Sequence, residues 1–87
     1  MNEESLLEFP CDFPLKVMGR KEGDFEAVVV ELVEKQVGPL ARDRVRQRAS
    51  RDGNFIALTV LLRAESQAQL DAVYAALSAH EQVLMVL

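Results

Sequence analysis

The sequence predicts one small α+β domain in which four strands and two helices follow one another in the order strand, helix, strand, strand, helix, strand. Three observations predict this class. Residues 12–19 alternate apolar and polar side chains, as a half-buried strand does; helical apolar spacing begins after Asp24 and again after Ser66; and an Asp-Gly turn at 52–53 separates two strand-like runs. A chain of 87 residues buries only about 60–65% of its unfolded surface, so most of its apolar residues are needed for a single core.

The first helix has a start signal and a stop signal. Asp24 stands where a carboxylate accepts hydrogen bonds from the first free helical amides, so the helix begins at Phe25. Gly38-Pro39 ends it, because glycine adopts the left-handed conformation that follows a helix and proline cannot continue one. One apolar stripe runs along it at helical spacing: Phe25, Val28, Val29, Leu32 and Val33.

A hairpin with an alternating charge pattern follows. Residues 42–49 are predicted to form a strand in which every second residue is arginine, so that four guanidinium groups project from one face. These arginines are Arg42, Arg44, Arg46 and Arg48. The turn at 50–54 leads into the strand 55–63, which carries apolar residues on both faces and is therefore predicted to be a central strand.

A second helix and a short last strand complete the chain. Ser66 and Gln69 form a capping box, in which each side chain satisfies an amide at the start of the helix. Its apolar stripe consists of Leu70, Val73, Tyr74 and Leu77. His80 falls near the end of this helix, where an imidazole interacts with free carbonyl groups. Residues 83–87 are wholly apolar and form the last strand.

This order of elements is the ferredoxin-like βαββαβ sandwich: an antiparallel four-stranded sheet with the strand order 4-1-3-2 and both helices on one face. Residues 12–87 make up the domain, and residues 1–11 form a polar lead-in. The opposite face of the sheet is left open. Phe55, Leu61 and either Leu84 or Val86 are expected on it beside the arginines, and an exposed apolar patch of this kind usually marks a contact with a partner.

Several short motifs resemble those of a known family. They are Leu6-Leu7-Glu8-Phe9-Pro10, Phe13, Lys16-Val17-Met18-Gly19, Gly53-Asn54-Phe55 and Met85-Val86-Leu87. With these motifs the chain resembles the YbeD-like family of small, uncharacterised bacterial proteins over nearly its whole length. The resemblance implies a ferredoxin-like domain similar to ACT regulatory domains, which bind small ligands such as amino acids between paired domains. None of the motifs is catalytic, and no ligand-contact residue is carried over.

The charge pattern and the cysteine content indicate in which cellular compartment the chain is expected. Its net charge is -4, yet residues 36–63 hold six basic and two acidic residues, so the middle third is locally basic. Charges interrupt every apolar stretch, which excludes a membrane-spanning helix. The acidic start of the chain has the wrong polarity for a secretory signal, and a cytoplasmic location is expected. The single cysteine, Cys11, has no partner within the chain for a disulfide.

The residues for catalysis are few. His80 is the sole histidine, and Cys11 lies next to Pro10 in a predicted loop. The carboxylates are spread over helix faces without the short spacing that a metal site needs. The loop 19–24 leads into a helix start that could attract a phosphate, but the carboxylate of Asp24 already occupies that position. We therefore expect no enzymatic activity, no metal and no cofactor. A small enzyme whose groups meet across a subunit boundary is the least supported hypothesis.

The arginines allow two interpretations. They protect an edge strand from aggregation, or they bind an anionic group, for which Arg44, Arg46 and Arg48 are the candidates. The leading hypothesis is a non-enzymatic regulatory or interaction module that binds a protein, a small anionic ligand or a second copy of itself through the open face, with Phe55 and Leu61 in the interface. The alternative is an RNA-binding ferredoxin-like domain. The acidity of the whole chain and the lack of a second aromatic residue beside Phe55 argue against nucleic acid, and no membrane contact is expected.

Overall fold

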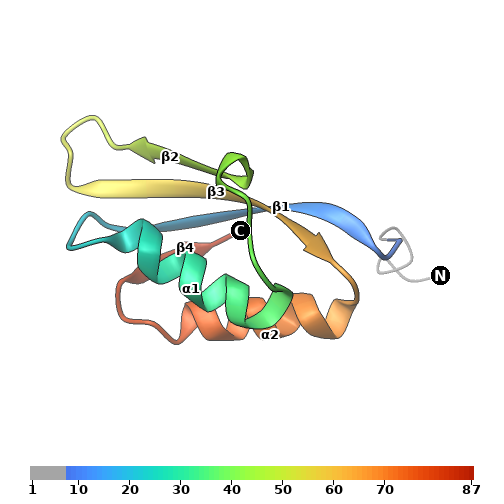
Figure 1. Cartoon of the computed structure of the whole chain (residues 1–87). Coiled ribbons are helices and arrows are strands. Elements are labelled where there is room, and N and C mark those ends of the chain that lie inside the picture. Colours follow the sequence, from blue (N-terminus) through green and yellow to red (C-terminus); the bar gives the residue numbers. More distant parts are fainter. Residues whose placement is uncertain (1–7) are drawn as a thin grey trace.

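A computed structural model describes residues 8–87, and Figure 1 shows its two layers: a sheet above and a pair of helices below it. The elements are β1 (Cys11–Arg20), α1 (Phe25–Val37), a 3₁₀ turn (Arg42–Arg44), β2 (Val45–Ala49), β3 (Phe55–Ala64), α2 (Gln67–Ser78) and β4 (Val83–Val86). All neighbouring strands are antiparallel, and their order across the sheet is β2-β3-β1-β4. The predicted ferredoxin-like fold and strand order are confirmed.

The hydrophobic core lies between the sheet and the helices. Strand alternation supplies one side of it, since Leu15 and Val17 of β1 and every second residue of β3 are buried while their neighbours are not. The predicted helix stripes supply the other side, with Val29 and Val33 of α1 fully buried. Each such side chain stabilises the fold by about 1.5–3 kcal/mol. Both helices pack on this face, so no helix or strand of residues 8–87 covers the other face of the sheet (Figure 1).

The helix ends are fixed by the residues that the sequence indicated. The side chain of Asp24 accepts a hydrogen bond of 3.1 Å from the amide of Ala27, and Ser66 Oγ accepts one of 3.1 Å from the amide of Gln69. Gly38 has a φ of 89°, which ends α1. The Gln69 side chain also donates to a backbone carbonyl at the end of α1, which joins the two helices.

The predicted strand 42–49 is wrong in its first part. Arg42–Arg44 form a 3₁₀ turn, closed by a hydrogen bond from the Arg44 amide to the carbonyl of Ala41, and the strand begins only at Val45. Leu40 and Val45 both pack against the core. Because they are five positions apart, a continuous strand would point them to opposite faces, and the turn brings both to the same side. Four arginines therefore do not line one strand face.

Smaller differences concern the chain ends. Of the predicted lead-in 1–11, residues 1–7 lie outside the described part of the chain, Phe9 packs against the core and Cys11 already belongs to β1. Leu87 follows β4 and still exchanges two backbone hydrogen bonds with Lys16. Within residues 8–87, no helix is long and apolar enough to cross a membrane.

The predicted role of His80 is also corrected. His80 lies after the end of α2, and its Nδ1 accepts a hydrogen bond of 3.2 Å from the amide of Gln82. The ring thus shapes the connection to β4 and does not cap the helix carbonyls, which are instead met by backbone amides such as that of Ala79.

Candidate functional site

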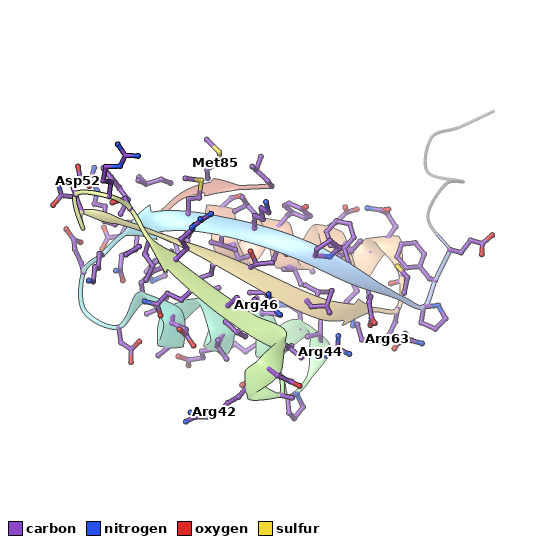
Figure 2. All side chains as sticks on the ribbon, turned by 90° about the horizontal axis from the view of Figure 1, so that it is seen from above. Arg42, Arg44, Arg46, Asp52, Arg63 and Met85 are labelled. Carbon is purple, nitrogen blue, oxygen red and sulfur yellow. The ribbon has the colours of Figure 1, made fainter. Side chains whose placement is uncertain are left out.

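The open face of the sheet is the surface on which the sequence placed its candidate residues, and Figure 2 views the molecule from that side. Its side chains come from the strand positions that alternate with the core positions. From β1 these are Asp12, Pro14, Lys16, Met18 and Arg20, and from β3 they are Phe55, Ala57, Thr59, Leu61 and Arg63. The antiparallel register sets each β1 residue beside one of β3, for example Lys16 beside Thr59 and Met18 beside Ala57.

Arg46 and Arg48 extend this surface along β2. Arg46 pairs with Thr59 and Arg48 pairs with Ala57, so both guanidinium groups belong to the open face. Among the described residues, ion pairs are formed by Lys35, Arg44 and Arg63, and neither Arg46 nor Arg48 takes part in one. These two arginines are therefore available to an external anion.

Arg44 has a different environment. Its Nη2 lies 3.5 Å from Asp12 Oδ1, and Nη1 of Arg63 lies 3.6 Å from the same oxygen. The carboxylate is thus shared by two guanidinium groups at the end of the face where β1 begins. Of the three arginines predicted to bind an anion, Arg44 is the one already engaged within the chain.

The surface is more basic than the arginine pattern alone indicated. Lys16, Arg20 and Arg63 join it from the neighbouring strands, giving six basic side chains and one carboxylate. These three residues were not predicted from the sequence as part of the site. Lys16 and Arg63 stand at outward positions of strands that the alternation had identified, but placing them beside the arginines needed the register between the strands. Arg20 was assigned to the loop 19–24 and instead ends β1.

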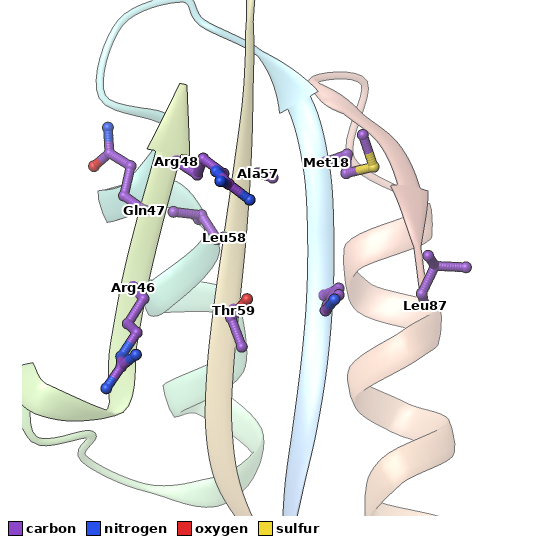
Figure 3. A pocket seen from close by; sticks show the side chains of 9 residues that line it. Met18, Arg46, Gln47, Arg48, Ala57, Leu58, Thr59 and Leu87 are labelled. Atoms are coloured by element: carbon purple, nitrogen blue, oxygen red, sulfur yellow. The ribbon is translucent and has the colours of Figure 1, made fainter. Parts of the chain in front are cut away.

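A shallow hollow of about 570 Å³ lies over the middle of this surface. Arg46, Arg48 and Lys16 line it together with Ala57, Thr59 and Met18 (Figure 3). Its floor is thus made of small and apolar side chains, and its charged groups are all basic. Such a hollow suits an anionic group that also brings apolar surface.

The apolar residues of the open face partly follow the prediction. Phe55 is 39% exposed and pairs with Arg20 at the far end of β1. Leu61 is half-buried beside Pro14. Of the two predicted alternatives on β4, Leu84 is 49% exposed, whereas Val86 pairs with the buried Val17 and packs against the core, so its predicted place on this face is wrong.

Met85 and Leu87 take the place that Val86 was expected to fill. Met85 pairs with Met18 on the open face, and Leu87 pairs with Lys16 through the backbone. An irregularity in the pairing of β4 with β1 lies between Met18 and Gly19. The wholly apolar sequence 83–87 carries no alternation that would fix this register in advance.

The titratable groups with altered pKa values lie away from the open face. The Ser50 hydroxyl and the amide of Asn54 donate to the Asp52 carboxylate in the β2–β3 turn and lower its pKa. Burial raises the pKa of Tyr74 on α2. Within residues 8–87, no group of three metal-ligating side chains comes together.

Comparison with known proteins identifies the family. The family model described as a protein of unknown function, DUF493, matches residues 4–87. The UPF0250 protein RSc0326 of Ralstonia nicotianae is 48% identical over 97% of this chain and 87% of its own, and the UPF0250 protein NE1487 of Nitrosomonas europaea is 40% identical over 100% of both chains. The solution structure of protein HP0495 from H. pylori has a TM-score of 0.72 with 16% identity, covering 100% of this chain and 94% of its own, and thereby supports the fold.

These matches bear out the resemblance that the motifs carried. The packing explains why the last residue of the Lys-Val-Met-Gly motif, Gly19, is a glycine, because a Cβ there would overlap the carbonyl oxygen of Gln82 and the ring of Phe25. The family match covers almost the entire chain and includes both the core and the basic open face. The chain therefore belongs to the DUF493 (UPF0250) family of small bacterial proteins, to which the YbeD-like pattern pointed.

Proposed function

We propose that this chain is a non-enzymatic interaction module, regulatory in the manner of ACT-like domains, that recognises an anionic group through the open face of its sheet. The observation that carries the proposal is the concentration of six basic side chains and one carboxylate on a single uncovered face of a chain whose net charge is -4. Chance scattering of ten basic among fourteen acidic residues would leave such a face mixed. Like charges placed this closely repel one another, and an anionic partner relieves that repulsion.

The central cations have the geometry for this role. Arg46 and Lys16 flank Thr59 in one row across the sheet, and Arg48 lies one row further along β2. A planar guanidinium binds a carboxylate or phosphate through two parallel hydrogen bonds, and two such groups on one strand face can share one anion. Protection of the edge strand β2 from aggregation is compatible with this role. It requires charge on β2 alone, however, and does not explain why Lys16 of the central strand β1 is also basic.

RNA is the second candidate, because the basic face is the feature that an RNA-binding sheet also presents. Ferredoxin-like RNA-binding domains stack bases on aromatic side chains in the middle of the sheet. Here those central positions of β3 hold Ala57 and Thr59, and Phe55 stands at the end of the strand. The face therefore favours an anion that contributes its own apolar contacts over a base that requires a stacking partner.

A titration followed by NMR tests the proposal. The ¹⁵N-labelled chain is titrated separately with amino acids, di- and tricarboxylates, sugar phosphates and a single-stranded RNA, and each mixture is analysed afterwards for chemical change. We expect saturable shifts at Lys16, Arg46 and Arg48 with an anionic compound and no conversion of it. Shifts confined to the helical side, or turnover of a compound, would contradict the proposal.

Matched variants show whether the response depends on the face. Arg46→Gln with Arg48→Gln should abolish the shifts while the circular dichroism spectrum stays unchanged. Lys21→Gln with Lys35→Gln removes the same charge from outside the face and should leave the shifts in place. For RNA, filter binding at low and high salt should show weak binding that is lost steeply with salt, as non-specific phosphate contacts are.

A further inference from the structure

The open face has a cationic half along β2, formed by Arg46 and Arg48, and an apolar half formed by Met18, Met85 and Leu87, and Lys16 of β1 adds a cation beside Leu87. Each of its two central rows begins with an arginine of β2 and ends with an apolar residue beside β1. One row runs across the sheet as Arg48, Ala57, Met18 and Met85, and the next runs as Arg46, Thr59, Lys16 and Leu87. Two rows with the same polarity form a surface that is basic along β2 and apolar along β4.

The side chains of the apolar half are exposed to solvent. Met18 is 38% exposed, Met85 48% and Leu87 60%. Over residues 8–87, every large exposed apolar side chain belongs to a strand or to the residue after β4, and none belongs to α1 or α2. Exposed apolar surface beside a charged rim is typical of a protein-binding surface, and methionine adapts its shape to different partners.

Residues 8–87 of a second copy do not complement this surface. Two open faces placed together bring no free acidic group to the arginines, because Asp12, the carboxylate of this face, is already shared by Arg44 and Arg63. The outer sides of the helices carry acidic residues such as Glu31 and Asp71 but offer no exposed large apolar side chain to Met18 and Met85. The binding partner must therefore present acidic and apolar groups next to each other on one surface. Neither the open face nor the helical face of residues 8–87 does so.

We propose that the open face binds an acidic amphipathic helix of another protein, with the apolar stripe of that helix over Met18, Met85 and Leu87 and its acidic residues toward Arg46, Arg48 and Lys16. Three strand spacings place β2 and β4 about 14 Å apart, and a helix with its side chains is about 10–12 Å across. One helix seated between these two strands thus lies within reach of the arginines of β2 and of Met85 on β4 at once. This inference rests on the proposed function and specifies its partner.

A designed peptide of about 18 residues, or five helical turns, tests the complementarity with the full chain. Its sequence places leucine along one stripe and glutamate along the adjoining stripe, and a fluorescent label reports binding by anisotropy. Two control peptides carry lysine in place of glutamate or the same composition in scrambled order. We expect binding of the acidic amphipathic peptide, with NMR shifts on the strands that carry both halves of the face, and binding at least about tenfold weaker for both controls.

Variants of the protein separate the two halves. Arg46→Gln with Arg48→Gln and, independently, Met85→Ser should each weaken binding of the acidic peptide by about tenfold or more, whereas Lys21→Gln with Lys35→Gln should leave it within about twofold. Arg46→Glu with Arg48→Glu should exchange the preference and bind the lysine peptide. Met85 and the arginine side chains are exposed, so the variants keep the fold, which circular dichroism verifies.

The outcomes distinguish this inference from the proposal on which it rests. Arginine-dependent shifts with a small anion or with RNA, but not with the acidic peptide, would overturn the helix partner and leave the anion-binding face. Peptide binding that ignores both the arginine and the methionine variants would overturn the helix partner as well. A face that responds to no anion of any kind would overturn both.

Discussion

Replacing Gly19 by alanine tests the packing that holds the open face in place. Gly19 is a buried residue of β1 and stands next to Met18, which belongs to the apolar half of the open face. A Cβ at this position would overlap the carbonyl oxygen of Gln82 and two ring carbons of Phe25. Phe25 is only 2% exposed and the other atom is backbone, so neither can swing away. The strand or the connection before β4 must shift instead.

The expected loss of stability follows from two opposing effects. Glycine in a strand interior costs about 0.5–1 kcal/mol relative to alanine, which the substitution would recover. Overpacking a core costs about 1–3 kcal/mol and occasionally more, and here two fixed groups are struck at once. We expect a net decrease of about 2 kcal/mol in the free energy of unfolding, which lowers the melting temperature of a domain this size by roughly 8–16 °C. Urea and thermal unfolding followed by circular dichroism measure both.

A double-mutant cycle with Phe25→Leu serves as the control. The smaller side chain removes the ring atoms that the new Cβ would strike, so Gly19→Ala should cost less in the Phe25→Leu background by at least about 0.5 kcal/mol. The clash with the Gln82 carbonyl remains, and rescue is therefore partial. A stabilising effect of Gly19→Ala, or strict additivity in the cycle, would refute the packing argument and leave the motif glycine without its structural reason.

Three further substitutions test the face, the hairpin turn and a helix start. Asp12→Asn removes the carboxylate that Arg44 and Arg63 share. Binding of the acidic peptide should tighten, because Asp12 no longer competes with the peptide carboxylates for these arginines, and weaker binding would contradict this competition. The free energy of unfolding should change by less than about 1 kcal/mol, because the ion pairs are partly exposed. The hydrogen bonds that lower the pKa of Asp52 stabilise the fold at pH values above the ordinary pKa of an aspartate, and this stabilisation is lost as the pH falls through the lower pKa of the folded state. In urea unfolding, the Asp52→Asn variant should therefore lose less stability between about pH 7 and about pH 2 than the unchanged protein. Ser66→Ala removes the α2 cap and should cost about 1 kcal/mol in the same assay, and an unchanged midpoint would argue against the cap.

The parts of the fold that the sequence predicted correctly depend on residues close together in the chain. Asp24 and Ser66 cap their helices through amides three residues ahead, and Gly38 ends α1 by its own left-handed conformation. The strand order followed from element order together with the handedness of crossovers, which leaves few alternatives for this pattern. Local chemistry and general topology were sufficient for these features.

The features that sequence reasoning missed all depend on contacts between distant residues. The 3₁₀ turn before β2 exists because Leu40 and Val45 both reach the core, and alternation of arginines alone argued for a continuous strand. The exposure of Met85 depends on its pairing with Met18, which an unpatterned apolar segment does not specify. The basic face was underestimated for the same reason, since its residues come from three strands and meet only through register.

The contrast between the acidic chain and its basic face restricts which anions this face can attract. Because the face is strongly basic while the net charge is -4, the rest of the chain carries an excess of negative charge, some of it on the helices behind the sheet. The smallest dimension of the molecule is 21 Å, whereas charges in physiological salt are screened over about 8 Å. An anion docked on the sheet is therefore attracted by the arginines and is hardly repelled by the acidic residues of the helices. A long polyanion that extends beyond the face is repelled by the negative charge around it. A short acidic segment with apolar side chains makes favourable contacts with both Arg46 and Met85, whereas a nucleic acid makes favourable contacts with the arginine alone. The charge distribution thus supports the proposed compact protein partner over a polymer of phosphates.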